Sequence, residues 1–81
     1  MVFEKIKLIL CEEFEIDDND ISLDAVLTID LGLGDIDLID LVMSIEDEFN
    51  VELPDEALEE ISTVADLVKY IEENIKKIED F

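Results

Sequence analysis

The side chains of this chain that could take part in chemistry are almost all carboxylates. The sequence holds 25 aspartates and glutamates, no histidine and a single cysteine, Cys11. A serine or cysteine nucleophile needs an adjacent base to activate it, and no Ser/His or Cys/His pair can form here. No glycine-rich phosphate-binding loop is present either. We therefore expect no catalytic residue and no enzymatic activity, and we expect Cys11 to pack in a helix.

One acidic run has the ligand alternation of a calcium-binding loop. Asp18, Asp20 and Ser22 are spaced as the first oxygen ligands of such a loop. The glycine that the loop needs next is replaced by Leu23, and its closing glutamate position holds Ile29. We therefore expect no metal site and interpret the run as a turn, because Asp and Asn side chains bond their own backbone.

The net charge of −20 limits the possible partners. Nucleic acids and anionic membrane surfaces would be repelled, whereas basic protein surfaces would be attracted. Ile, Leu and Val recur through every segment, so the chain is too apolar for a disordered acidic tail. Its 81 residues predict a single domain, 1–81. With no secretory signal and no apolar stretch near the roughly 20 residues of a membrane span, we expect a cytoplasmic monomer.

A loop with two glycines leads into the most strongly patterned segment. Gly32 and Gly34 permit unusual backbone angles just before it, and Asp35 is suited to the N-cap or the first turn of a helix. That role is sufficient to explain Asp35. At 100° per residue, apolar side chains fall within one arc of about 100°; they are Leu38, Leu41, Val42, Ile45 and Phe49. The spacing predicts a helix that ends at Phe49 and buries one face.

The opposite arc of this predicted helix mixes apolar and acidic residues. It holds Ile36 and Met43 beside acids, namely Asp40 and Asp47, with Asp37 and Glu46 on its flanks. One interpretation is ordinary, because isolated exposed apolar side chains are common on any surface. The other is a docking face, on which Ile and Met are buried by a partner while the carboxylates meet its Lys and Arg.

These residues resemble the acyl carrier protein family. The resemblance is carried by Asp30-Leu31-Gly32, by the segment from Asp37 to Phe49, by Glu52-Leu53-Pro54-Asp55-Glu56 and by Ile61-Ser62-Thr63-Val64. It covers nearly all of the chain. It implies a protein of fatty-acid biosynthesis or related lipid and thioester metabolism, which carries 4'-phosphopantetheine on a serine and docks acyl-transferring or synthase enzymes through its second helix.

The chain departs from the family at the attachment motif. The family's Asp-Ser-Leu reads here Gly34-Asp35-Ile36, so an ungapped alignment places Asp35 where the serine carries the arm. A carboxylate cannot accept the arm as a hydroxyl does, and we expect no 4'-phosphopantetheine on this sequence. The partner-contacting positions that the resemblance carries over are Asp37, Asp40, Met43, Glu46 and Asp47, with Glu56 and Ile61 near the third helix.

Three interpretations remain open at this stage. The chain is a carrier or carrier-derived protein, or it is an interaction module that kept the docking face and lost the arm. The third is a laboratory substitution that blanks an ordinary carrier. Against this last one, Gly34 and Ile36 also differ from the family motif, and a single blocking change would leave them alone.

Three further helices complete a predicted all-α four-helix bundle with three longer helices and one short one. The first runs from Val2 to about Glu15, and the short one from Pro54 to about Glu60. The last follows Thr63, which with Asp66 resembles a capping box, and runs to about residue 77. Its apolar stripe comprises Val64, Leu67, Val68, Ile71, Ile75 and Ile78.

The connection from Ile21 to Leu33 is long for so small a domain. We expect it either to pack down onto the bundle, with Leu27 and Leu31 as anchors, or to contain a short helical turn, which residues 22–25 could supply.

Overall fold

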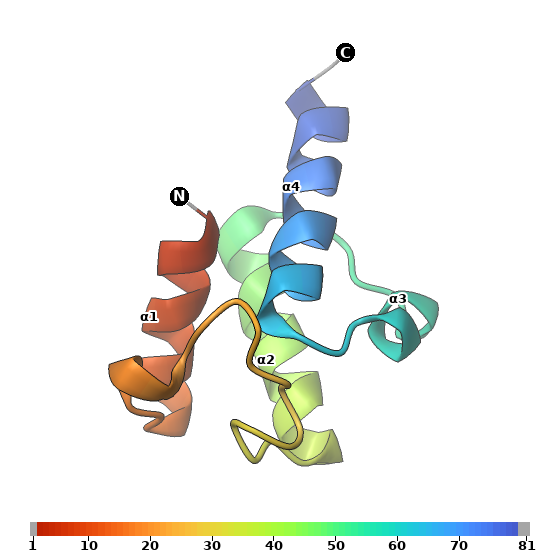
Figure 1. The fold of residues 1–81 in the computed structure, drawn as a ribbon. Helices are drawn as coiled ribbons and strands as arrows, with labels where there is room; N and C mark the ends of the chain where they lie inside the picture. The colour runs from red at the N-terminus through yellow and green to blue at the C-terminus, as the bar shows by residue number, and fades with distance from the viewer. Residues whose placement is uncertain (1, 80–81) are drawn as a thin grey trace.

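The computed structural model describes residues 2–79, with side chains for residues 2–75. Its helices are α1 (Val2–Phe14), the 3₁₀ turn η1 (Asp18–Asp20), α2 (Asp35–Phe49), α3 (Asp55–Glu60) and α4 (Val64–Glu79). In Figure 1, α1, α2 and α4 stand together while the short α3 lies to one side. The described part of the chain contains no β-strand, which confirms the predicted all-α fold of three longer helices and one short one.

The core is built from the apolar stripes of the three longer helices. Side chains that are at most 2% exposed come from α1, α2 and α4; they are Ile6, Leu10, Leu41, Ile45, Val64, Leu67 and Ile71. The predicted stripe of α2 is buried at its centre, while Leu38 and Phe49 at its edges are half-buried. Among the described residues no polar or charged side chain is buried, so burial of apolar surface is the main stabilising term.

The long connection between α1 and α2 is pinned at two places. At its start, Asp17 Oδ1 accepts the backbone N–H of Asn19 at 3.0 Å and caps η1. The short helical turn of the connection lies at η1, upstream of residues 22–25, which form a single turn in which Ala25 N–H donates to Ser22 O at 3.1 Å.

Further along, the connection pairs with the segment before α4. Leu27 N–H donates to Ser62 O at 3.0 Å and Val64 N–H donates to Ala25 O at 3.0 Å. These bonds flank an isolated antiparallel bridge between Val26 and Thr63. Leu27 is buried, as predicted, and so it anchors the connection that leads to the start of α2 (Figure 1).

The start of α4 is a complete capping box. Thr63 Oγ1 accepts the N–H of Asp66 at 3.1 Å, and Asp66 Oδ2 accepts the N–H groups of Thr63 at 3.2 Å and Ser62 at 3.1 Å. These backbone donors hold the pKa of Asp66 below its ordinary value of 3.8, with Thr63 the larger cause. The predicted cap is confirmed. The helix continues to Glu79, past the predicted end, and the side chain of Ile78 lies outside the described residues.

Candidate docking face and attachment position

The N-cap residue of α2 has no side chain that could cap the first turn. Gly34 occupies the cap with extended angles, φ −86° and ψ −180°. Its N–H donates to Asp37 Oδ2 at 3.0 Å, which forms half of a capping box, because glycine has no side chain to return the bond. Asp35 is the first helical residue and is exposed. Of its two predicted roles the first-turn role is therefore correct, and its charge complements the positive end of the helix dipole.

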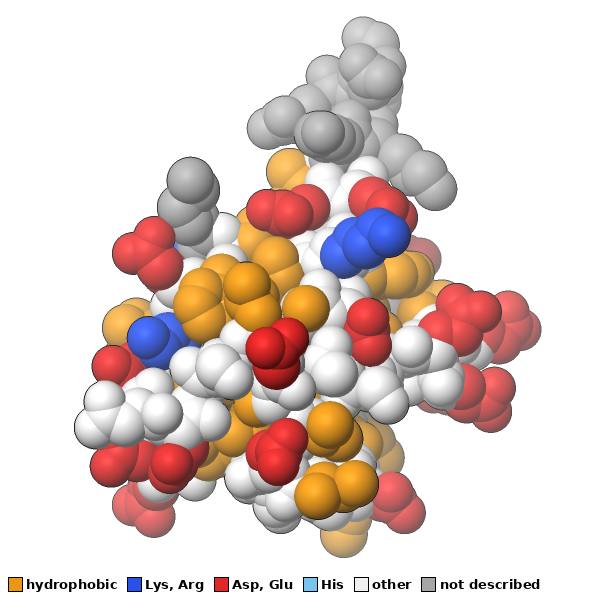
Figure 2. Space-filling view, in the orientation of Figure 1, with side chains coloured by type: hydrophobic (Ala, Val, Ile, Leu, Met, Phe, Trp, Pro, Cys, Tyr) orange, Lys and Arg blue, Asp and Glu red, His pale blue; other side chains and the backbone are white. Residues whose placement is uncertain are grey.

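Apolar side chains gather at the surface of α2. Ile36 is 76% exposed, Ile39 56% and Met43 59%. Residues spaced i, i+3 and i+7 are neighbours on a helix, so these side chains form one patch. Figure 2 shows apolar groups beside acidic ones at the end of the molecule where α2 begins. A contiguous exposed apolar patch of this kind is typical of a contact site.

Sequence reasoning missed Ile39. The signal was available, because Ile39 lies outside the arc of the core stripe and at helical spacing from both Ile36 and Met43. We define the docking face as Ile36, Ile39, Asp40, Met43 and Asp47.

The predicted acidic residues of α2 separate into two groups. Asp40 and Asp47 are exposed and belong to the docking face. Asp37 and Glu46 are half-buried and hold backbone donors, since Glu46 Oε2 accepts the N–H of Leu53 at 2.9 Å and Asp37 holds that of Gly34. Glu46 thereby ties α2 to the chain that leads into α3. Asp37 and Glu46 have only part of their carboxylate surface left for a partner.

The remaining predicted contact residues belong to the α3 side. Glu56 is exposed in α3, whereas Ile61, directly after it, is half-buried and packs on the core. An open hollow of about 160 Å³ between α3 and α4 is lined by Ile61 together with Asp66, Lys69 and Tyr70. Ile61 therefore combines a packing role with a partly accessible surface.

Comparison with known proteins decides the family. The family model described as the phosphopantetheine attachment site matches residues 4–71. An acyl carrier protein of Thermotoga maritima is 45% identical over 74 residues, which cover 91% of each chain. One of Clostridium acetobutylicum is 42% identical over 71 residues, 88% of this chain and 92% of its own. The chain belongs to the acyl carrier protein family.

The fold of this acyl carrier protein family member agrees with that assignment. A crystal structure of an acyl carrier protein from Thermotoga maritima superimposes with a TM-score of 0.82 at 30% identity, over 96% of this chain and 95% of that one. Members of this family are carrier proteins rather than enzymes, as the names of the relatives and of the family model indicate. The predicted family, fold and absence of catalysis are thus confirmed.

Among the described side chains, those of residues 2–75, no grouping of His, Cys, Asp and Glu is arranged to hold a metal ion. None of the helices described over residues 2–79 is long and apolar enough to cross a membrane.

Proposed function

We propose that this chain is an acyl-carrier-type protein of fatty-acid biosynthesis or related thioester metabolism. It acts as a single domain that docks basic surfaces of acyl-transferring or synthase enzymes. The observation that carries this proposal is the docking face, an exposed patch of Ile36, Ile39 and Met43 beside Asp40 and Asp47 on the second helix of a fold from this family. Glu56 and Ile61 on the α3 side are proposed as secondary contacts.

The two kinds of side chain on the docking face have different roles. Asp40 and Asp47 raise the rate of association, because opposite charges steer a basic partner over a distance of about 8 Å in physiological salt. The apolar patch is desolvated only after contact, so it slows dissociation. Met43 suits several partners, since its unbranched thioether adapts to different surfaces.

We infer that Asp35 occupies the attachment position of the family, so that 4'-phosphopantetheine does not fit this chain. Asp35 is exposed where a modifying enzyme could reach it, but it offers a carboxylate rather than a hydroxyl. The nearest hydroxyl along α2 is Ser44, which at about 1.5 Å rise per residue lies some 13 Å further down the helix axis. Ser44 Oγ also donates to Glu13 Oε1 at 2.6 Å. A holo form would therefore need a change at Asp35.

A second candidate is an interaction module derived from the carrier fold. Gly34 and Ile36, on either side of Asp35, also differ from the Asp-Ser-Leu motif. Divergence across the whole motif favours a chain that no longer needs the modifying enzyme, whereas the docking face does not depend on the arm.

Intact-mass measurement after incubation with coenzyme A and a permissive phosphopantetheinyl transferase tests the inference on Asp35. The parent should gain no mass, and Asp35→Ser should gain one arm, more completely when Gly34→Asp and Ile36→Leu accompany it. Ser44→Ala is the control and should change neither result. A mass gain by the parent would overturn the assignment of Asp35, and a triple variant that stays unmodified would favour the interaction module.

The docking face itself is tested with an enzyme of acyl transfer as partner. Asp40→Lys with Asp47→Lys should slow association and weaken its salt dependence, while Met43→Ala should mainly speed dissociation. Asp24→Lys with Glu72→Lys, at exposed positions of the α1–α2 connection and of α4, makes the same change of net charge outside the proposed contacts. If the two charge variants bind alike, docking does not use α2.

A further inference from the structure

The surface between α1 and α2 is hollowed along its length. One hollow of about 230 Å³ is lined by Lys5, Leu8, Ile9, Glu12, Glu13 and Glu48. A second of about 320 Å³ is lined by Glu13, Phe14, Asp40, Met43, Ser44 and Asp47. Glu13 borders both hollows and its hydrogen bond to Ser44 separates them, so they are two adjoining depressions, which together we call the α1–α2 seam. Its second half reaches the docking face.

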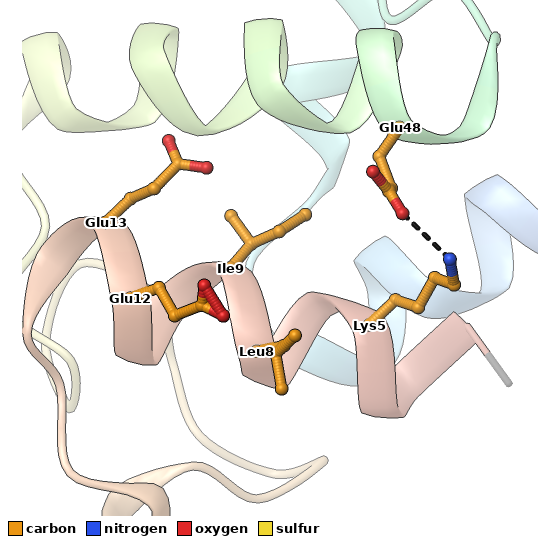
Figure 3. A pocket seen from close by; sticks show the side chains of 6 residues that line it. All are labelled: Lys5, Leu8, Ile9, Glu12, Glu13 and Glu48. Carbon is orange, nitrogen blue, oxygen red and sulfur yellow. Dashed lines mark hydrogen bonds and ion pairs between the residues drawn. The ribbon is translucent and has the colours of Figure 1, made fainter.

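The floor of the seam is apolar. Ile9 points into the space between the two helices in Figure 3 and is half-buried there. Leu8 stands at the rim and is 61% exposed, so its apolar surface is open to contact. Phe14 and Met43 supply apolar surface in the second hollow. Glu13 crosses from α1 to Ser44 on α2 at 2.6 Å, where the two hollows meet.

The rim of the seam is acidic, and one cation already occupies it. Lys5 Nζ lies 2.8 Å from Glu48 Oε1 at one end of the first hollow (Figure 3). Among residues 2–75, no lysine pairs with Glu12, Asp40 or Asp47. The Lys5 pair shows how an ammonium group fits between the helices. The unpaired carboxylates give the rest of the rim the charge to hold further cations.

We propose that the α1–α2 seam binds a short amphipathic helix of a partner protein, with lysine or arginine beside a leucine-sized apolar residue. From Asp40 to Glu48 the seam runs about 12 Å at 1.5 Å per residue, a little over two turns of a docked helix. Laying an apolar stripe into a groove between helices is an established recognition mode. A second copy of this chain is excluded as occupant, because two chains of net charge −20 repel each other.

This inference rests on the proposed function, since Asp40, Met43 and Asp47 belong to both surfaces. It goes further by placing α1 in the contact. Leu8, Ile9 and Glu12 lie outside the docking face. Substitutions at these residues therefore distinguish binding at the seam from binding at the docking face alone.

The test uses a synthetic helical peptide with leucines on one face and lysines on the other, titrated into isotope-labelled protein. Amide shifts should be largest around Leu8 and Glu12 in α1. Leu8→Ser with Glu12→Lys should weaken binding by about tenfold, because contact area and charge are both lost. Leu23→Ser with Glu72→Lys makes the same chemical change at exposed positions outside the seam and should bind within about twofold of the parent.

Three results would overturn the proposal: equal weakening by both variants, shifts confined to Ile36 and Ile39, or binding that does not saturate. Circular dichroism of each variant shows that it is folded. Ile36→Ser with Ile39→Ser tests the proposed function separately against an acyl-transfer enzyme and should leave the peptide affinity unchanged. If that variant binds the enzyme normally while the peptide still depends on Leu8, the proposed function fails and the seam stands.

Discussion

The helices α2 and α4 begin in different ways. At α4, Thr63 and Asp66 exchange side-chain and backbone hydrogen bonds, and Asp66 also accepts from Ser62. At α2, the N–H of Gly34 donates to Asp37 Oδ2, and Gly34 has no side chain that could accept a bond in return. The four N–H groups at the start of a helix need partners, so α4 satisfies more of them from within the chain and α2 leaves more to solvent or to another molecule.

The side chains at the start of α4 are also more buried than those highlighted at the start of α2. Just inside α4, Val64 is 0% and Leu67 2% exposed, whereas in the first turns of α2 Ile36 is 76% and Ile39 56% exposed. The start of α4 is thus part of what holds the bundle together. The exposed side chains Ile36 and Ile39 at the start of α2 contribute little to folding and stay available for contact.

The largest contrast should appear when each region loses an apolar side chain. Leu67→Ala leaves a cavity in the core and should lower the free energy of unfolding by about 2–5 kcal/mol. Ile36→Ala removes an exposed side chain and should change it by less than about 0.5 kcal/mol. Urea denaturation followed by circular dichroism measures both. Similar losses in the two variants would show that Ile36 packs on the fold and would end the comparison.

Removing the side-chain cap of α4 should have the next largest effect. Thr63→Ala loses the oxygen that accepts the Asp66 N–H, which should lower the free energy of unfolding by about 1 kcal/mol. Thr63→Ser keeps the hydroxyl and serves as the control. Stability that is equal in the alanine and serine variants would mean that the Val26–Thr63 bridge, and not the cap, holds this end.

Completing the cap of α2 should raise stability. The angles of Gly34 suit any residue, and a Cβ there would lie 3.8 Å from its nearest neighbour, Asp37 Oδ2. Gly34→Ser should therefore add about 0.5 kcal/mol, by supplying a cap and reducing the freedom of the unfolded chain. Gly32→Ser is the opposite control. Gly32 has φ +70°, a conformation that favours glycine, so this variant should be less stable than the parent. A less stable Gly34→Ser would show that the open cap is structurally required.

The smallest effect concerns pH. Because folding lowers the pKa of Asp66, its carboxylate contributes stability that is present above the ordinary value of 3.8 and is lost as pH falls through the lower, folded value. Asp66→Asn should therefore be less stable than the parent near pH 7, and the difference should shrink below about pH 4. Melting temperatures from pH 7 to 2.5 measure this. If the melting temperatures of the parent and Asp66→Asn differed by the same amount at every pH, the charge of Asp66 would not contribute to the stability of the cap.

Local signals were enough to predict most of the fold. Thr63 and Asp66 marked the start of α4, Pro54 directly precedes α3, and the apolar stripes predicted three longer helices. Each depends on residues close in sequence, so pattern and capping chemistry suffice.

What the sequence did not predict depends on competition or on distant contacts. The side chain of Asp17 decides where the connection turns, and several acids nearby could have done so. Glu46 was predicted to face a partner, but its bond to Leu53 depends on how the chain returns after α2. The α1–α2 seam likewise needs the two helices to be placed side by side.

Hydrogen bonds fix the chain on both sides of α3, so α3 can unfold locally while the rest of the bundle stays folded. Glu46 holds Leu53 before α3, and Ser62 is held by Leu27 after it. Residues 54–61 therefore form a loop whose closure cost is already met by the rest of the fold. Losing the helix there exposes little more than Ala57 and the half-buried Leu58. Native-state hydrogen exchange should thus find α3 amides opening on their own, while the Leu27 and Val64 amides exchange only when the whole bundle unfolds.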